Sequence, residues 1–250
     1  MNGEQQPEPG YEKKSGQSPE QGEHLSARTI ALMLWTLLPI PAIWVGLYVI
    51  KSATWAFALY HIICLIPAII WGQKIWRPSF LKPSRKEMAA LLGASVVFSG
   101  LALLLYEVLG KKLLSNEETL TLLKTLGYSK ELFYPLSFYA IVVNPLVEEL
   151  FWRGVVFNEL EKVKAPFKHF GLIWSSLAYA AFHYLIFRMV LFPIYAEIGT
   201  LMLAVYGAVL ALIYRKTGSI LTTAIAHGLL TDMAAIVLIL DLLYHYPGRI

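Results

Sequence analysis

Residues Leu132 to Phe157 read LFYPLSFYAIVVNPLVEELFWRGVVF, an apolar run long enough to cross a bilayer as a helix. Within it Glu148 and Glu149 are adjacent, and Arg153 follows Glu149 by four residues. A charged side chain at bilayer depth costs about 3 kcal/mol on insertion scales, so such groups face a protein interior or a wet cavity. The run therefore predicts a membrane-spanning helix that carries a functional site.

The composition of the whole chain places this helix in a membrane protein. Of its 250 residues, 57% are hydrophobic and 15% are charged, whereas a soluble domain carries about 25% charged residues. We therefore expect an all-α fold, a polytopic transmembrane helix bundle of about seven spans within a range of six to eight. The net charge of +4 indicates basic loops against a lipid bilayer, with no nucleic-acid partner.

Apolar segments follow one another at regular spacing after residue 26. We predict spans at Thr29–Ile50, Ala53–Ile75, Met88–Leu109, Leu132–Phe157, Phe170–Phe187, Met189–Tyr214 and Ile220–Tyr244. Spans separated by one or two residues could instead form hairpins or partly re-entrant segments. Residues Ser115–Gly127 are too short and too polar to cross, and they are typical of an amphipathic helix in the membrane interface.

The two ends of the chain differ in character. Residues 1–26 form a polar tail without apolar periodicity, which we predict to be disordered. Residues 27–250 are predicted to form one transmembrane helical domain, with its motifs in a core at 132–244. The basic loop from Lys74 to Lys86 indicates a cytoplasmic N-terminus. We therefore expect a plasma or inner membrane protein with its site toward the cytoplasmic side.

The two glutamates are expected to have different roles. Glu149 and Arg153 have the i,i+4 spacing of an ion pair, which would neutralise one carboxylate. Glu148 lies on another side of the helix and is left to take a proton from water. The alternative is that both glutamates belong to a structural ion-pair network with Arg153. Asn144-Pro145 comes just before, and proline often kinks a transmembrane helix.

Two later spans each supply a histidine. In the fifth span, Tyr179 lies one turn from His183 and places an aromatic ring beside the imidazole. In the seventh span, His227 and Thr231 share a helix face, and Asp232 is close round the turn. A neutral histidine can donate a hydrogen bond, accept a proton or bind a metal. Alone, each is more often a satisfied interior residue; together with the glutamates they indicate a catalytic site.

These three segments carry a resemblance to a known family. EELFWR at 148–153 resembles the EExxxR motif of the CaaX-protease and bacteriocin-processing (CPBP) intramembrane proteases, which include the Ras-converting CaaX endopeptidase and abortive infection proteins. YAAFH at 179–183 is similar to its FxxxH motif, with Tyr for Phe. HGLLT at 227–231 is similar to HxxxN, with Thr for Asn and Asp232 one step further. The resemblance covers about residues 137–232.

The resemblance implies an enzyme, a CaaX endopeptidase-like hydrolase. It implies that Glu148 activates the attacking water together with His183, and that Glu149 and Arg153 support Glu148.

In the same way, the resemblance implies that His227 and Thr231 stabilise the tetrahedral oxyanion. Tyr179 is expected to help orient these groups. Thr231 can donate through its hydroxyl, whereas Asp232, if ionised, can only accept a hydrogen bond.

We expect no required cofactor, because a glutamate and histidine pair can activate water directly. The alternative is Zn²⁺ held by Glu148, His183 and His227 with an open position. However, the chain has no HExxH helix, and these ligands come from three separate helices.

The expected activity is hydrolysis of a peptide bond in a membrane-associated or lipid-modified protein, and a prenylated CaaX substrate is what the eukaryotic members imply. A second hypothesis is a catalytically silent membrane scaffold or bacteriocin-immunity-type protein of the same fold, which the altered third motif favours. A third hypothesis is a transporter or proton relay. It ranks last, because the sequence has neither inverted repeats nor paired broken helices.

Overall fold

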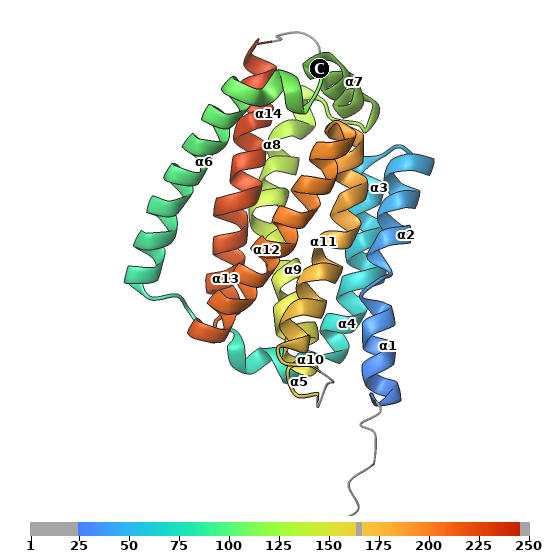
Figure 1. Ribbon diagram of the computed structural model, residues 1–250, viewed down its shortest axis with the longest axis vertical. Helices are drawn as coiled ribbons and strands as arrows, with labels where there is room; N and C mark the ends of the chain where they lie inside the picture. Colours follow the sequence, from blue (N-terminus) through green and yellow to red (C-terminus); the bar gives the residue numbers. More distant parts are fainter. Residues whose placement is uncertain (1–24, 164–166, 246–250) are drawn as a thin grey trace, which may run out of the picture.

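The computed structural model describes residues 25–163 and 167–245, and these residues form helices without any strand (Figure 1). The predicted all-α bundle is therefore confirmed. Residues 1–24, most of the tail predicted to be disordered, lie outside the described residues. The α-helices are α1 (Ala27–Trp35), α2 (Pro39–Trp44), α3 (Ala53–Ala58), α4 (Ile66–Trp71), α5 (Gln73–Trp76), α6 (Arg85–Leu113), α7 (Asn116–Thr125), α8 (Lys130–Phe138), α9 (Asn144–Glu149), α10 (Asn158–Leu160), α11 (Phe170–Val190), α12 (Pro193–Thr217), α13 (Ile220–His227) and α14 (Met233–His245).

Short π-helical segments join several of these helices end to end. They are η1 (Val45–Val49), η2 (Leu59–Leu65), η4 (Tyr139–Val143), η5 (Leu150–Phe157) and η6 (Gly228–Asp232), and η3 (Arg77–Ser79) is a 3₁₀ turn. A π-helical turn inserts one extra residue, so it shifts the side chains that follow it round the helix axis, and such turns are frequent at functional sites.

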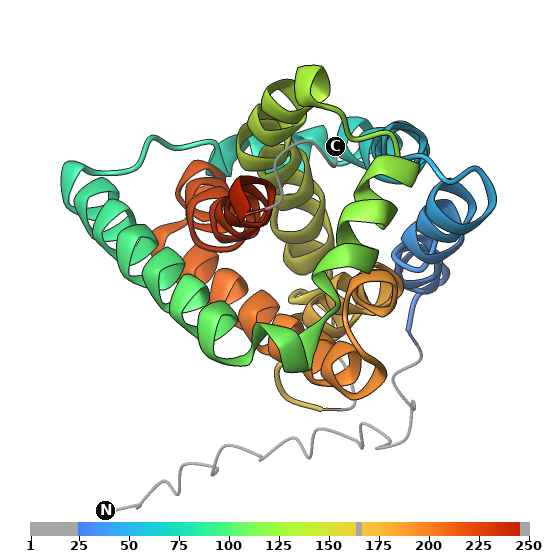
Figure 2. The same cartoon turned by 90° about the horizontal axis from the view of Figure 1, so that it is seen from above.

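Six helical runs of the described chain are long and apolar enough to cross a membrane, within the predicted range. They are Ala27–Val49, Ala53–Trp71, Arg85–Gly110, Phe170–Val190, Pro193–Thr217 and Ile220–His245. The predicted span Leu132–Phe157 is not among them. It is helical from α8 to α10 and runs alongside the others between α14 and α11 (Figures 1 and 2).

Serine residues cap the N-termini of several helices. A serine side chain precedes the first helical residue and accepts a hydrogen bond from a backbone N–H of the first turn, which satisfies one of the donors that a helix start leaves free. The capping residues are Ser26, Ser52, Ser84, Ser115, Ser129 and Ser219. At Ser84 the cap is reciprocal, since Glu87 also accepts from the Ser84 N–H. These caps fix where α1, α3, α6, α7, α8 and α13 start.

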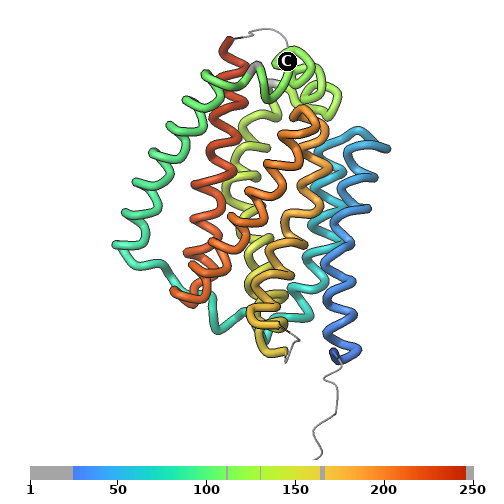
Figure 3. The backbone as a smooth tube through the Cα atoms, in the orientation of Figure 1, coloured from blue at the N-terminus to red at the C-terminus, as the bar shows by residue number. Residues whose placement is uncertain are grey.

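The predicted amphipathic segment Ser115–Gly127 contains the short helix α7, which lies across one end of the bundle (Figure 1). It buries Leu120 and Leu123 against the bundle, and the carbonyl of Leu126 accepts a hydrogen bond from the N–H of Ala53. Helix α6 stands at the outer edge beside α14 (Figure 3), and most of its surface is exposed. Such an exposed apolar surface suits contact with lipid.

Candidate active site

The adjacent glutamates close helix α9, and the π-helical segment η5 follows at once with Arg153. Both carboxylates are buried, Glu148 at 2% and Glu149 at 0% exposure. Of the π-helical segments, η2, η4, η5 and η6 all lie at or beside this pair. The two glutamates therefore sit where several helices leave regular geometry.

Glu149 is the centre of a buried charge network. Its Oε1 accepts a hydrogen bond from Arg153 Nη1 at 2.7 Å and another from His227 Nδ1 at 3.0 Å. The predicted i,i+4 ion pair is thus present, and it is joined by a histidine 78 positions later in the chain. This arrangement ties η5 to α13 through one carboxylate oxygen.

Arg153 has its other contacts inside the bundle. Its Nη2 donates to the carbonyl of Gly207 on α12 at 2.9 Å, and its guanidinium lies 4.9 Å from the ring centroid of Tyr179 on α11. A buried cation is stable only when it is paired and hydrogen-bonded. Glu149, Gly207 and Tyr179 together provide that environment, so Arg153 fastens three helices around Glu149.

His227 is engaged at both ring nitrogens. Nδ1 donates to Glu149, and Nε2 lies 3.1 Å from the hydroxyl of Tyr179. The same Nε2 is 3.6 Å from Asp232 Oδ1 and 3.8 Å from Glu148 Oε2. Both glutamates, Tyr179 and Asp232 therefore meet around one imidazole, as the predicted grouping of the motifs requires.

Glu148 differs from Glu149 in its surroundings. Its Oε2 is buried without a hydrogen-bond partner, and the Tyr60 hydroxyl lies beside the carboxylate. Tyr60 is itself held by Trp152, whose Nε1 donates to its hydroxyl at 3.2 Å. Glu148 therefore has a buried acceptor oxygen without a hydrogen-bond donor.

His183 lies on α11, and its ring packs against Phe182 with the centroids 4.1 Å apart. Nδ1 donates to the Tyr179 carbonyl at 2.8 Å, which leaves Nε2 as the free nitrogen. Within the described chain, no hydrogen bond or ion pair joins His183 to Glu148. A shared action on water, as the resemblance implies, would need the water to lie between them.

Thr231, the last residue of the third motif, makes its hydrogen bonds within its own helix. The Thr231 hydroxyl donates to the His227 carbonyl at 2.9 Å, one turn earlier in the same helix. It also lies 3.4 Å from Asp232 Oδ1. The single hydroxyl hydrogen is therefore used by the helix backbone, a common arrangement for threonine inside helices.

The residues do not form a preassembled metal site. Among the described residues, no group of three or more histidine, cysteine, aspartate or glutamate side chains is arranged to hold a metal ion. His227, a ligand in the zinc alternative, has both nitrogens occupied by Glu149 and Tyr179. It would have to leave one of them to bind zinc, so the donor set does not fit this alternative.

Sequence reasoning did not assign several residues to the site. Asn144 could have been found, because it lies one turn before Glu148 on the same helix face. Tyr60 and His61 come from the second span, and only the packing of that span against α9 shows their place. Gly207 takes part through its backbone carbonyl, for which side-chain patterns give no signal.

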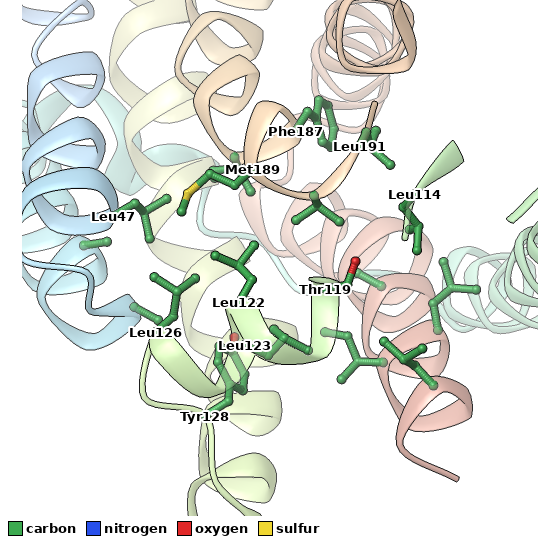
Figure 4. Close-up of a pocket in the computed structure, with 18 of the residues that line it drawn as sticks. Leu47, Leu114, Thr119, Leu122, Leu123, Leu126, Tyr128, Phe187, Met189 and Leu191 are labelled. Atoms are coloured by element: carbon green, nitrogen blue, oxygen red, sulfur yellow. The ribbon is translucent and has the colours of Figure 1, made fainter. Parts of the chain in front are cut away.

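An apolar cavity of about 410 Å³ lies at the α7 end of the bundle (Figure 4). Its lining comes from α2, η1, α3, α6, α7, α11 and α14 and includes Leu47, Leu114, Leu122, Leu123, Leu126, Phe187, Met189 and Leu242. Two lining rings also contact site histidines. Phe57 stacks on His61 at 5.9 Å, and Phe187 lies 6.4 Å from His183. The cavity and the polar site therefore share aromatic walls.

Comparison with protein families gives one match. Residues 130–231 match the model of the family described as type II CAAX prenyl endopeptidase Rce1-like. This segment holds all three motifs described above and ends one residue before Asp232. Neither the curated proteins nor the solved structures gave a match. The matched family supports a CAAX-type intramembrane endopeptidase in general.

Replacing Arg153 is expected to unfold the bundle. Arg153→Met leaves the carboxylate of Glu149 buried without its cation, and breaking a buried pair in this way costs about 3–5 kcal/mol. We expect a large fall in the thermal unfolding midpoint in detergent. Arg188→Met, on the exposed end of α11, is the control and should shift the midpoint little. A midpoint for Arg153→Met equal to that of the control would contradict the structural role of the pair.

Gly228 is expected to tolerate no side chain. A Cβ built on it would lie 2.1 Å from the carbonyl oxygen of Ile141, a backbone atom that cannot move aside alone. Gly228→Ala should therefore push η6 away from η4 and displace the adjacent His227. We expect lower thermal stability and weaker activity. Gly93→Ala on α6, where a Cβ meets nothing within 4 Å, is the matched control and should be neutral or stabilising.

Proposed function

Since residues 130–231 form an Rce1-like domain, we propose that this protein hydrolyses a peptide bond of a membrane-associated or lipid-modified protein with water activated by Glu148. The observation that carries the proposal is the contrast between the two glutamates. Glu149 is held through Oε1 by Arg153 and His227, with its Oε2 left without a hydrogen-bond partner, whereas neither residue hydrogen-bonds Glu148, whose Oε2 is buried 3.8 Å from His227 Nε2. One carboxylate is positioned by the fold, and the other is available for chemistry.

The proposed reaction begins with a water molecule held by the free oxygen of Glu148 and by Nε2 of His183. Glu148 takes one proton of the water as the oxygen attacks the scissile carbonyl carbon. The electron pair of the C=O bond moves onto the carbonyl oxygen and gives a tetrahedral oxyanion. Glu148 then returns the proton to the leaving amine, and the C–N bond breaks. No serine or cysteine nucleophile takes part.

Glu149, Arg153 and His227 act as the support of this reaction. Arg153 is 2% exposed and has no contact with Glu148 among its hydrogen bonds, so its charge serves Glu149. His227 Nε2 lies within 3.8 Å of Glu148 Oε2, and Tyr179 fixes the ring. We assign the three residues to holding Glu148 in place and to setting the electrostatic environment of the site.

The apolar cavity supports a lipid-modified substrate. It lies against the rings of Phe57 and Phe187, which also contact His61 and His183. A hydrocarbon chain in the cavity would therefore lie next to the polar site, where the attached peptide could meet Glu148. The gain of about 0.8 kcal/mol per CH₂ group applies to a chain taken from water. A chain that is already in the bilayer would be held by close packing against the cavity wall instead.

We further propose that the N-terminus is cytoplasmic and that the site opens toward the cytoplasm of a plasma or inner membrane. The distribution of lysine and arginine supports this orientation. In this orientation α10, which follows the glutamates, lies at the cytoplasmic end of the bundle with the start of α1, and the apolar cavity beside α7 lies toward the opposite end (Figure 1). A substrate would then reach Glu148 from the cytoplasmic side, with its lipid extending past the site into the cavity.

The catalytically silent scaffold remains the second candidate, because one observation favours it. Thr231 stands where the resembled motif has asparagine, and its hydroxyl is bonded to the helix carbonyl of His227. The predicted oxyanion donor is thus engaged elsewhere. A scaffold needs no hydrogen-bond donor for an oxyanion, whereas in a protease another residue would have to supply it.

The first test is cleavage of membrane-presented peptides by purified protein in detergent, with farnesylated CaaX peptides included. Glu148→Gln is expected to lower kcat by about 10³-fold, within the range for loss of a general base. The fold should survive, since glutamine keeps the shape of glutamate, and Glu148 Oε2 has no hydrogen bond to lose and only approaches His227 Nε2, at 3.8 Å. Glu197→Gln is the matched control, because Glu197 is exposed and accepts only from Tyr184.

A chelator-treated sample of the wild type belongs in the same experiment. Activity that persists with chelator but is lost in Glu148→Gln would support a glutamate-dependent protease. Activity lost in both would favour zinc. A folded Glu148→Gln protein that cleaves as fast as the wild type would overturn the proposed role of Glu148.

Filling the apolar cavity is expected to act on lipidated substrates alone. Leu122→Trp on α7 adds an indole to the cavity, and we expect KM for a farnesylated peptide to rise about tenfold, a change of about 1.4 kcal/mol. KM for the same peptide without the lipid should not change. Leu201→Trp, on the exposed face of α12, is the control. Equal effects on both peptides would show that the cavity does not hold the lipid.

A further inference from the structure

We propose that Asn144 donates the hydrogen bond that stabilises the tetrahedral oxyanion, and that His61 positions the Asn144 amide for this role. The inference rests on the proposed peptidase function and adds two residues to it. Neither residue belongs to the three motifs that carry the family resemblance.

The need for another donor follows from the contacts of the third motif. The Thr231 hydroxyl is bonded to the His227 carbonyl. Asp232 presents a carboxylate, which only accepts when ionised. Both nitrogens of His227 already face Glu149 and Tyr179. None of these groups has a hydrogen that is free for a developing oxyanion.

Asn144 has such a hydrogen and lies at the right place. It begins α9 and stands one turn before Glu148, so the two side chains share a helix face. Its Nδ2 lies 3.5 Å from Asp232 Oδ2, longer than a good N–H···O hydrogen bond. The amide is therefore weakly held and 8% exposed. It can turn toward a stronger acceptor without losing a strong contact.

His61 is built to orient this amide. It is 3% exposed, and its Nδ1 lies 3.1 Å from the Phe57 carbonyl and 2.9 Å from the Tyr139 hydroxyl, which fix the ring. Its Nε2 has no hydrogen-bond partner, and neither has Oδ1 of Asn144. The two side chains face each other closely enough to interact. When the neutral ring carries its hydrogen on Nε2, Nδ1 accepts from the Tyr139 hydroxyl, and the approach to the Phe57 carbonyl is then no hydrogen bond. In that tautomer Nε2 is a donor for the open Oδ1 of Asn144.

The packing of η2 against α9 sets this pair in register with the catalytic carboxylate. Tyr60 lies beside Glu148, and the next residue, His61, lies beside Asn144. Two consecutive residues of η2 thus meet two residues one turn apart on α9. The same contact that places Tyr60 at the proposed base places His61 at the proposed donor.

In the reaction, the water oxygen bonds to the carbonyl carbon while Glu148 takes one proton. The carbonyl oxygen gains the electron pair of its double bond, and the Asn144 Nδ2–H donates to it as the charge develops. Asp232, the weak partner of Nδ2 in the free protein, is released in this step. A donor aimed at the developing charge stabilises the transition state more than the ground state, so it raises kcat with little effect on KM.

The kinetic test compares Asn144→Ala, His61→Ala and the double variant with the wild type, using full-length protein in detergent and a farnesylated CaaX peptide. We expect Asn144→Ala to lower kcat about 10²-fold, as loss of one oxyanion donor does, with KM within about threefold. His61→Ala should lower kcat by less. Because His61 acts only through Asn144, the double variant should be no slower than Asn144→Ala.

A rescue experiment separates this role from a structural one. Thr231→Asn places an amide at the position where the resembled motif has one. When it is added to Asn144→Ala, we expect kcat to rise at least tenfold above that of Asn144→Ala. Thr222→Val is the matched control for loss of a buried polar group, because Thr222 is 2% exposed and its Oγ1 also lacks a partner. It should keep wild-type kcat. If Asn144→Ala does not fold, Asn144→Leu, of similar volume, replaces it.

A binding measurement tests the inference without turnover. A peptidyl phosphinate mimics the tetrahedral oxyanion, and wild type should bind it more tightly than the matching uncleaved peptide. Asn144→Ala should lose that preference while keeping its affinity for the peptide. If the wild type prefers the phosphinate but cleaves nothing, loss of that preference in Asn144→Ala would leave the donor standing and overturn the peptidase. Wild-type cleavage with unchanged kcat and phosphinate affinity in Asn144→Ala would overturn the donor alone.

Discussion

The carboxylate of Glu149 is the contact on which the arrangement of the site depends. One oxygen, Oε1, accepts from Arg153 and from His227, and Arg153 in turn reaches Gly207 and Tyr179. These contacts join η5, α13, α12 and α11 in the interior, where an unpaired charge would be costly. Moving any one of the four elements away would leave a charge or a strong donor without its partner. The pairing therefore fixes the relative positions of the helices that carry the chemistry.

The anchoring of Glu149 also explains why the chain has two adjacent glutamates. Neighbouring helical residues point in different directions, so the fold can use Glu149 for anchoring while Glu148 faces another part of the interior. If both glutamates served as anchors, they would compete for the guanidinium of Arg153. The structure separates the two roles. Of the two glutamates, Arg153 hydrogen-bonds only Glu149, whereas Glu148 lies beside Tyr60 and the edge of the His227 ring. The spacing of Arg153 four residues after Glu149 decides which glutamate is anchored.

The sequence predicted the helices and the motif residues, because hydropathy and helical spacing are local properties of the chain. The i,i+4 pair of Glu149 and Arg153 is such a case. It did not predict Gly207, whose backbone carbonyl has no side-chain signature, nor the approach of Gly228 to Ile141. Nor did it single out His61, since the part of His61 in the site depends on how η2 packs against α9. The π-helical segments add further changes of register that no local pattern specifies.

The distribution of unpartnered polar atoms bears on whether the site is active or silent. A network kept only for folding is expected to satisfy its members, because each buried polar atom without a partner costs about 1–3 kcal/mol. In this site the anchoring contacts of Arg153 and His227 are made, while Glu148 Oε2, Glu149 Oε2, Asn144 Oδ1 and His61 Nε2 have no hydrogen-bond partner. All four belong to α9 or to η2, which packs against it, whereas the other buried side-chain polar atoms without a partner in the described chain are the hydroxyls of Ser99, Ser137 and Thr222. The shared location of the four atoms favours a site arranged to receive a ligand over one that merely holds the helices together.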